Sequence, residues 1–350
     1  MPSSKNTPQA LNKSTDERLL KPNEMSDAKN VTISTDSDGN GFVVKNAKGN
    51  AVIPAASGSQ ITQDGGYEVL GSCVDEEDNT MYFAVYDTTS INHGIYRIDF
   101  NATTLEYKKV LVTRHLFGTK PEFVDMDIIR ADVNQAGTIV PLIYMTDNVT
   151  EPKKINVNRA LSLTYNDVSD EADILEFLSV AKTKPVHDFS VIGRKDLNFD
   201  GNFIYGKNLS FAIQWVYQDG ERSALSNISE CTVPVTVLTH EEDGYRKNDV
   251  NFYEVSVDKG TQEVKQINVY YRDNETGAVY LADRLQRNTD LKRTVGSTET
   301  TIYSATSSTY RFYGDRDQEP IALIEANKLF DNVPLVAKTQ CIADGRLVYG

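Results

Sequence analysis

Residues 81–100, MYFAVYDTTSINHGIYRIDF, decide the fold class of this chain. Two segments rich in aromatic and β-branched residues, 81–86 and 94–100, flank a polar loop at 87–93. This pattern is typical of a β-hairpin. Residues 105–113 add a third segment of the same kind, and three strands joined in chain order form a meander, the unit of a propeller blade. The stretch therefore predicts a mainly β protein.

A weaker copy of this pattern follows further along the chain. Residues 142–145 and 154–157 are strand-like, and turn-forming residues lie between them. Repeated strand-turn-strand units indicate a β-propeller or a similar closed β-architecture. We therefore predict that residues 21–202 form part of a propeller-like body made of β-meanders. It contains one helix near residues 170–182, where apolar side chains share a face and acidic residues occupy the first turn.

A second β-rich unit is predicted at residues 203–318. It opens with a strand at 209–217 that contains Trp215, and Asp219-Gly220 then forms a turn of the hairpin type. Further strands are expected at residues 251–257, 265–272 and 278–285. This arrangement indicates a fibronectin-III or immunoglobulin-like β-sandwich inserted into the propeller-like body, with few short helices in the whole chain. Residues 319–350 then form a segment that returns to the body.

Length and charge limit the classes of function. A chain of 350 residues exceeds what one hydrophobic core usually organises, so we expect at least two domains. Lys and Arg number 36 against 50 Asp and Glu, and the net charge of −14 disfavours tight binding to DNA or to anionic lipid. No apolar run approaches the roughly 20 residues that span a bilayer, so we expect no membrane segment.

The first 20 residues differ from the rest in composition. They are rich in Ser, Thr, Asn, Lys and Pro and have little apolar surface to bury. We predict a flexible N-terminal arm that becomes ordered only against a neighbouring subunit.

Two stretches resemble the beginning of a calcium-binding loop, one at Asp36 and Asp38 and the other at Asp196 and Asp200. Neither has a carboxylate at the twelfth position that an EF-hand requires. Short runs of Asp, Asn and Gly usually form turns in which the side chains bond to nearby backbone, and we favour that interpretation. A calcium site of another type at either pair remains the alternative.

Motifs for catalysis are missing or broken. The cysteines, Cys73, Cys231 and Cys341, are odd in number and lack the spacing of a zinc site or a disulfide framework. No metal-binding spacing links the four histidines, which are His93, His115, His187 and His240. Neither a GxSxG nor a GxGxxG motif is present. Acidic runs at 75–78 and 241–243 look like solvated loop charge rather than a glycosidase pair. We predict no catalytic, cofactor-binding or metal-binding residues, no cofactor and no enzyme activity.

Four stretches, read together, resemble the tail muzzle, or nozzle, proteins of short-tailed, crAss-like bacteriophages. They are residues 20–31, residues 143–148 with 151–157, residues 215–226, and residues 330–334 with 344–350. The second stretch is similar to the family's YWTDG…PRKIN pattern, although Met145 replaces an aromatic residue and Asn148 replaces a glycine. The four are spread over most of the chain.

This resemblance implies a structural virion protein of the phage tail. Family members form an oligomeric ring, expected to be hexameric, at the distal tail end, where the genome is retained and ejected. The implied partners are copies of the same chain, ring and adaptor proteins, tail fibres, and passing phage DNA without specific binding. An acidic lumen would let DNA slide past. The implied location is the virion, after assembly in the cytoplasm of the host bacterium.

The last residues read as a strand that stops at Gly350 without a polar tail. An unpaired strand edge is usually covered or charged in folded proteins. We therefore expect a C-terminal continuation of the chain, or a second fragment, that supplies the missing partner strands.

Two other interpretations remain open. An extracellular glycan-binding or glycan-hydrolysing β-propeller protein could combine the same two kinds of domain. A phage tail fibre adaptor would share the assembly chemistry but would not occupy the axial ring.

Overall fold

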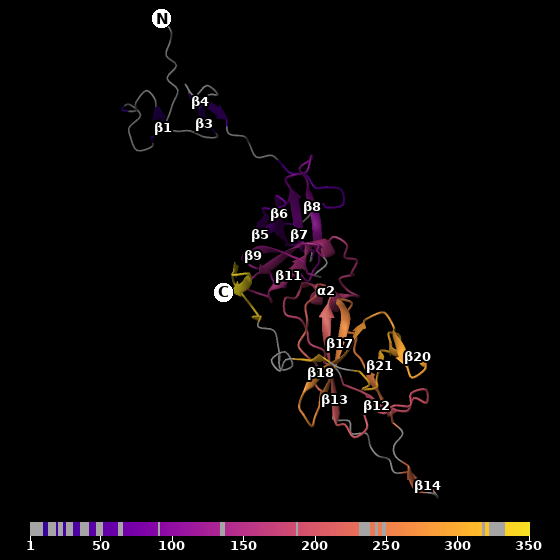
Figure 1. Cartoon of the computed structure of the whole chain (residues 1–350). Helices are drawn as coiled ribbons and strands as arrows, with labels where there is room; N and C mark the ends of the chain where they lie inside the picture. The colour runs from indigo at the N-terminus through magenta and orange to yellow at the C-terminus, as the bar shows by residue number, and fades with distance from the viewer. Residues whose placement is uncertain are drawn as a thin grey trace. The chain divides into compact units, whose positions relative to one another are not determined.

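The computed structural model describes residues 10–12, 19, 24–25, 31–35, 42–46, 52–61, 66–89, 92–133, 137–186, 188–230, 239–241, 244–246, 250–316, 319–321 and 333–350. The chain divides into two compact units, Met1–Pro54 and Ala55–Gly350 (Figure 1). The described part contains two short helices and is otherwise built from antiparallel strands, apart from one short parallel pair. The mainly β fold with few short helices is therefore confirmed.

The first unit contains two small strand pairs. β1 (Ala10–Leu11) pairs in parallel with β2 (Glu24–Met25), and β3 (Val31–Thr35) pairs antiparallel with β4 (Phe42–Asn46). β1 lies within residues 1–20, where we expected an arm, and its main chain bonds to a strand that follows that arm.

The second unit begins with the predicted meander. Its four strands pair antiparallel in chain order, and they are β5 (Tyr67–Asp75), β6 (Thr80–Asp87), β7 (Gly94–Asp99) and β8 (Tyr107–Val112). The hairpin and third strand predicted from residues 81–113 are thus confirmed. Alternate side chains, such as Tyr82 and Ala84 of β6 and Ile95 of β7, point into one buried core.

A three-stranded sheet shares that core. It has the order β11-β10-β9, and its strands are β9 (Asp125–Ala131), β10 (Val140–Thr146) and β11 (Lys153–Asn156). The second strand-turn-strand unit predicted from the sequence is therefore present. Helix α1 (Val157–Ala160) follows β11 directly, and α2 (Glu171–Leu178) packs Ile174, Phe177 and Leu178 against the same core.

The second helix is shorter than the span of 170–182 that we predicted. It ends at Leu178, and Ser179 is extended and forms a bridge with Lys153 of β11. The ammonium group of Lys182 donates to the carbonyl oxygens of Glu176 at 2.7 Å and of Ser179 at 2.9 Å. A helix end leaves carbonyl groups without intrahelical donors, and a lysine that supplies such donors allows the helix to stop.

None of the described sheets closes on itself. Two meanders share this part of the core, and no ring of blades is seen in the described residues. Strand-turn-strand patterns identify single meanders but not how many of them close a ring, so the propeller stays a prediction.

The predicted sandwich is present as two sheets around a second core. One sheet has the order β12-β16-β21-β20-β19 and the other β13-β17-β18-β22. The strands of the first sheet are β12 (Val191–Arg194), β16 (Phe252–Ser256), β19 (Leu291–Val295), β20 (Thr298–Ser304) and β21 (Thr309–Phe312). Those of the second are β13 (Leu209–Tyr217), β17 (Val264–Asp273), β18 (Val279–Gln286) and β22 (Glu319–Pro320). β12 lies before residue 203, where we expected this unit to begin.

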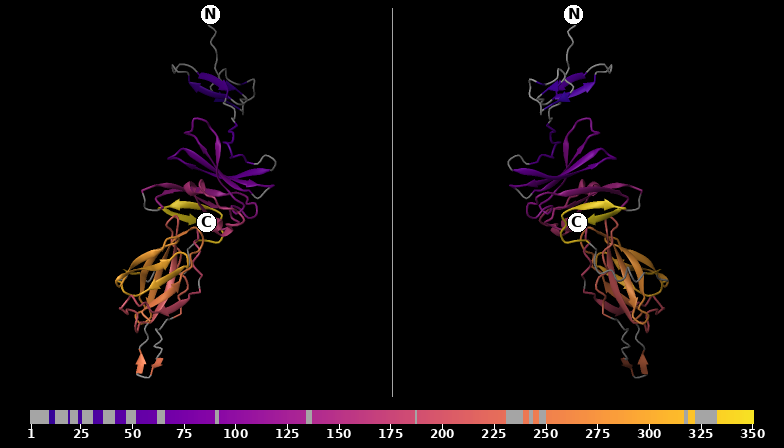
Figure 2. Two further views of the ribbon diagram at one scale, coloured as in Figure 1. Left: turned by 90° about the vertical axis from the view of Figure 1, so that its right-hand side faces the viewer. Right: turned by 90° about the vertical axis from the view of Figure 1, so that its left-hand side faces the viewer.

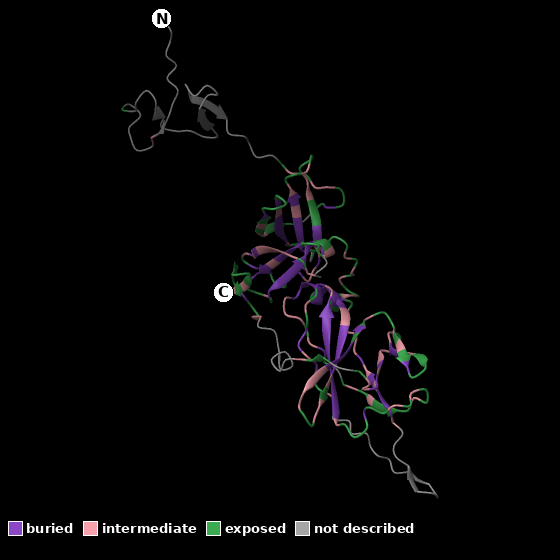
Figure 3. Ribbon diagram, in the orientation of Figure 1, coloured by how far each residue is buried: buried purple, intermediate pink, exposed green. Residues whose placement is uncertain are grey.

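The core between the two sheets contains large aromatic side chains. β13 is buried along its whole length (Figure 3). Trp215 of β13 is 7% exposed, and its Nε1 donates to the carbonyl oxygen of Asp258 at 2.9 Å. A small pair, β14 (Thr239–Glu241) with β15 (Gly244–Arg246), extends the loop between β13 and β16.

The Asp219-Gly220 turn is confirmed, but a regular strand does not follow it. Gly220 has a φ of 82°, which suits glycine, and its N–H donates to the Tyr217 carbonyl at 2.9 Å. Beyond the turn, every third residue faces β13. The backbone N–H groups of Ser223, Ser226 and Ser229 donate to β13 carbonyls, and their hydroxyls accept from β13 N–H groups. A repeat of three residues per turn is that of a polyproline II helix.

After the sandwich the chain returns to the sheet of β9, β10 and β11. β23 (Gln340–Ala343) and β24 (Arg346–Tyr349) form a hairpin that lies beside this sheet (Figure 2). The Gln340 N–H donates to Asp125 Oδ2 at 3.0 Å, and the Asn148 N–H donates to the Ala337 carbonyl at 2.9 Å. Among the described residues, no helix is long and apolar enough to cross a bilayer.

Candidate functional site

A group of buried and half-buried charges lies where the three-stranded sheet meets the sandwich. We call it the junction cluster, and its members are Lys154, Arg159, Lys182, Asp219, Glu221 and Glu263. The three cations come from β11, α1 and the segment after α2, and the three acids come from the turn after β13 and the residue before β17. Formal charges therefore cancel within the cluster.

Lys154 is the most buried member. Neighbouring Ile155 points into the shared core, so Lys154 points to the opposite side of the sheet. Its Nζ lies 3.1 Å from Asp219 Oδ2 and 2.6 Å from Glu221 Oε1, and its side chain is 2% exposed. A buried ammonium group is tolerated when it is paired and hydrogen-bonded in this way.

Arg159 joins α1 to the sandwich through two acids. Its Nη2 lies 2.7 Å from both carboxylate oxygens of Glu263, and its Nη1 lies 3.4 Å from Asp219 Oδ1. The guanidinium also stacks over the Phe177 ring of α2, with 5.1 Å from its carbon to the ring centroid. Tyr165 donates to Glu263 Oε1 at 2.8 Å. Glu263, with a side chain 2% exposed, is thus held by two donors.

Asn156 connects the local helix start to the cluster. Its Oδ1 accepts from the Arg159 N–H at 3.2 Å and caps α1, while its Nδ2 donates to Asp219 Oδ1 at 2.8 Å. The same side chain therefore begins the helix that presents Arg159 and orients the carboxylate that Arg159 approaches.

Lys182 closes the cluster on the side of α2. Its Nζ lies 3.6 Å from Glu221 Oε2 and 5.1 Å from the centroid of the Tyr217 ring. Burial lowers the pKa of Lys182, and the charge of Glu221 opposes that effect. The Tyr217 hydroxyl donates to the Thr183 carbonyl at 2.7 Å, so β13 is also tied to this segment directly.

A further contact ties α2 to the sandwich. Asp173 Oδ1 accepts from the Gln262 N–H at 2.6 Å, and its Oδ2 accepts from the Gln262 Nε2 at 3.1 Å. Two groups of one residue thus donate to one carboxylate.

The electrostatics favour the ionised forms. Burial alone would raise the pKa of Asp219, but the charges of Lys154 and Arg159 lower it by a larger amount. The pKa of Asp219 therefore lies below its usual value. For Arg159, burial lowers the pKa and the bond to Glu263 more than reverses that effect. These pairs link the three-stranded sheet and α1 to the sandwich.

The acids singled out in the sequence are used locally. Asp196 Oδ1 accepts from the Asn198 N–H at 2.9 Å, which is the turn geometry that we favoured. Its Oδ2 accepts from the distant Tyr313 hydroxyl at 2.8 Å. Asp200 is exposed. Asp36 and Asp38 lie outside the described residues. Within the described ranges, no group of three or more His, Cys, Asp or Glu residues is placed to bind one metal ion.

One acidic run differs from our expectation of solvated loop charge. Asp75 is 3% exposed and binds Arg130 with both oxygens, which lie 3.0 Å from Nε and 2.7 Å from Nη2. Asp78 and Glu77 also approach this guanidinium. The run begins at Asp75, the last residue of β5, so its side chains reach Arg130 on the neighbouring β9 and form an ion pair that the chain order does not reveal.

The histidines and cysteines of the described ranges have structural surroundings. His93 is buried, stacks on Tyr86 with 4.3 Å between ring centroids, and accepts the Asp87 N–H at Nδ1. His115 Nε2 lies 2.9 Å from the Asp167 carbonyl. Burial raises the pKa of the Cys73 thiol to about 12. His187, Cys231 and the side chain of His240 lie outside the described residues, and Cys341 is an exposed free thiol.

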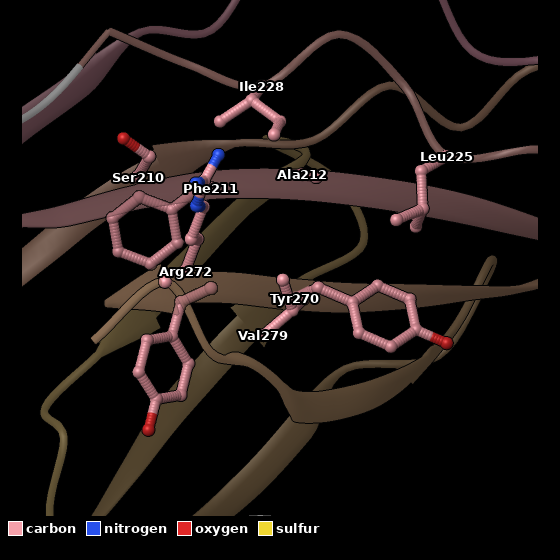
Figure 4. A pocket seen from close by; sticks show the side chains of 10 residues that line it. Ser210, Phe211, Ala212, Leu225, Ile228, Tyr270, Arg272 and Val279 are labelled. Atoms are coloured by element: carbon pink, nitrogen blue, oxygen red, sulfur yellow. The ribbon is translucent and has the colours of Figure 1, made fainter. Parts of the chain in front are cut away.

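A pocket of about 170 Å³ lies on the sandwich, between β13, β17 and the segment that follows the Asp219-Gly220 turn (Figure 4). Ala212, Leu225 and Val279 contribute apolar walls. Two polar groups of the pocket already have protein partners: Ser210 Oγ accepts from Asn274, and the Tyr270 hydroxyl donates to Gln214. No acid, histidine or cysteine lines the pocket, so it offers no acid-base pair.

Sequence reasoning did not find the junction cluster, although it had singled out its parts. Residues 151–157 and 215–226, two of the stretches that carried the resemblance, meet where Lys154 contacts Asp219 and Glu221. The available signal was Lys154 beside Ile155 in a short strand, together with the acidic tight turn at Asp219.

One family model, described as Crassvirus muzzle protein, matches residues 3–294. The match spans both meanders, the junction cluster and most of the sandwich. Among the curated proteins, no match was found.

Proposed function

Because this chain belongs to the Crassvirus muzzle protein family, we propose that it forms a ring, hexameric in copy number, at the distal end of the phage tail. The ring retains the genome before infection and lets it pass during ejection. The observation that carries the proposal is the family match over residues 3–294, which makes the chain a phage structural protein of the tail. The ring, its copy number and the role in ejection are the proposed part.

The junction cluster supports a mechanical role. A conduit for DNA has to keep its shape while its subunits are pushed apart, and a sandwich attached only by flexible linkers would move relative to its neighbours. Here β11 and α1 hold the sandwich through Asp219 and Glu263, both nearly inaccessible to water. Buried pairs are screened by salt much less than exposed pairs.

The charge of the chain supports passage without binding. At a net charge of −14, the average surface repels phosphate, and DNA has little tendency to adhere to it. We propose that acidic side chains line the lumen and that passing DNA makes no specific contact.

We further propose that the protein acts without catalysis and without a cofactor, together with copies of itself and with ring, adaptor and fibre proteins of the virion. The N-terminal arm orders against a neighbouring subunit, and the sandwich is an insertion in a propeller-like body. The virion tail is the location, after assembly in the host cytoplasm.

Electron cryo-microscopy of purified particles tests the ring directly. We expect density for residues 55–350 in six copies around the axis at the distal tail end. Density on the capsid, or at the fibres away from the axis, would contradict the proposal.

Deletion of residues 1–18 tests the arm. Particle assembly should fail, while circular dichroism of the purified variant shows the same cooperative unfolding of the β domains as the full chain. Normal assembly of the deletion variant would show that the arm has no role in it.

A further inference from the structure

Polar side chains also gather on the face of the β9–β10 pair that points away from the shared core, beneath the C-terminal hairpin β23–β24. We call this group the polar layer. In the pairing of these strands, Tyr144 lies opposite Asp127 and Thr146 lies opposite Asp125. Met126 and Met145, the residues between them, point into the shared core. The four polar side chains therefore share the other face of the sheet.

The hairpin β23–β24 covers that face through Gln340. The Gln340 N–H donates to Asp125 Oδ2 at 3.0 Å, and its Nε2 donates to the Tyr144 carbonyl at 2.8 Å. Since Nε2 is committed to a carbonyl oxygen, the other atom of the amide, Oε1, has to be an acceptor. Tyr349 lies opposite Gln340 in the hairpin.

Several oxygens in this layer are buried and have no hydrogen-bond partner among the described residues. They are Asp127 Oδ2, Thr146 Oγ1, Gln340 Oε1 and Tyr349 Oη. Thr146 is only 1% exposed and Gln340 only 8% exposed. Unpartnered buried polar atoms are rare in folded proteins, and each one needs a physical explanation.

The charge of the layer is also uncompensated. Asp125 and Asp127 stand two residues apart on one face, and no ion pair within the described ranges joins either of them to a cation. Burial raises the pKa of Asp127, the charge of Asp125 raises it further, and a hydrogen bond with the Gln340 side chain partly offsets this rise. Water could satisfy the hydrogen bonds of the four oxygens, but it would leave two like charges side by side.

We propose that Asp125, Asp127, Thr146 and Gln340 bind a calcium ion that fastens the C-terminal hairpin to the sheet. Carboxylate, hydroxyl and amide oxygens are ligands of a hard cation, and calcium accepts an irregular set of six to eight oxygens that includes water. Magnesium demands a near-ideal octahedron and keeps most of its own water, which suits this mixed set less well. The site is separate from the two acidic stretches at Asp36 and Asp196 that the sequence brought forward.

Terbium luminescence and thermal unfolding of the full chain test the site. Terbium replaces calcium at oxygen sites, and Tyr144 and Tyr349 are placed to transfer excitation to it. We expect saturable terbium emission that calcium displaces, and a melting temperature that rises with calcium and falls again with a chelator. A wild-type protein that shows neither response overturns the proposal, and a larger melting shift with magnesium overturns the choice of metal.

Substitutions separate a ligand from a merely structural residue. Asp127→Asn should weaken calcium binding by at least about tenfold. In chelator, the same variant should melt at the wild-type temperature or above it, because one of two like charges is gone. A purely structural aspartate would instead lower the melting temperature in chelator and leave the calcium response intact, which would overturn the proposal.

Two further variants test whether a lost calcium response comes from misfolding or from a calcium site elsewhere in the chain. Thr146→Val keeps the shape of the side chain, removes one oxygen, and should reduce calcium affinity without loss of the fold. Asp200→Asn, a change at an exposed acid of the loop suggested by the sequence, should leave the calcium response unchanged. If Asp200→Asn abolishes the response while Thr146→Val preserves it, the ion binds at the loop and the proposed site is wrong.

Discussion

Replacing Lys154 by methionine tests the junction cluster, because methionine keeps much of the side-chain length and removes the charge. Asp219 and Glu221 then each lose one of two cations, and breaking a buried ion pair costs about 3–5 kcal/mol. Glu221 is 32% exposed and can turn to water, while Asp219 keeps its bonds to Asn156 and Arg159. We therefore expect the lower end of that range, about 3 kcal/mol.

Urea unfolding followed by tryptophan fluorescence measures the loss. Trp215 is the single tryptophan and lies inside the sandwich, so its emission reports on the part of the protein that the cluster anchors. Arg284→Met is a matched control, because Arg284 and Glu319 form a pair of similar length, 3.2 Å, with side chains 57% and 69% exposed. An exposed pair contributes less than about 1 kcal/mol.

A double-mutant cycle with Asp219→Asn isolates the pair. In the Asp219→Asn background, removing Lys154 leaves no charge unpaired at position 219. The double variant should therefore lose less stability than the sum of the two single variants, with a coupling of about 1–3 kcal/mol. If Lys154→Met costs no more than Arg284→Met, or if the two changes add without coupling, the cluster does not hold the sandwich in the way described.

Three further predictions concern the rest of the fold. Gly296→Ala should destabilise the sandwich more than Gly206→Ala, because both glycines have positive φ but only at Gly296 would a Cβ overlap a neighbouring carbonyl oxygen. Backbone strain alone costs about 1–2 kcal/mol in both variants, so equal melting temperatures would contradict the clash. Ser226→Ala leaves a buried N–H of β13 without its acceptor and should cost about 1–3 kcal/mol in urea unfolding, whereas no loss would mean that the serine repeat does not seal the strand edge. Burial lowers the pKa of His93 below its usual 6.5, so stability that is complete above pH 6.5 should fall as the pH drops toward the lowered value; thermal unfolding between pH 7.5 and 5.5 should show this loss in the wild type and not in His93→Asn.

Local patterns predicted the strands well, because a strand is decided by side chains two residues apart. The hairpin at 81–100 was visible as two apolar segments around a polar loop, and it is present as β6 and β7. The helix near 170–182 was correct in kind and too long by one turn. Its end depends on Lys182, whose side chain folds back on the carbonyl groups of Glu176 and Ser179, and no periodicity in the sequence signals such a contact.

The junction cluster could not be predicted, since its members lie far apart in the chain. In the sequence, Lys154 was one residue of a strand-like segment, and Asp219 was one half of a common turn. Their contact depends on how the three-stranded sheet packs against the sandwich, and that packing follows from two hydrophobic cores rather than from either local sequence.

By itself, the sequence determined the mainly β class, the order of the meanders and the sandwich, and the resemblance to muzzle proteins, because alternation of apolar residues and turn formers acts over short distances. Only the tertiary structure decided which charges are buried, which oxygens gather beneath the C-terminal hairpin, and how the chain returns to the sheet that it left. Those features depend on side chains that come from distant segments, and the free energy of such a contact is set by the burial and the partners that folding creates.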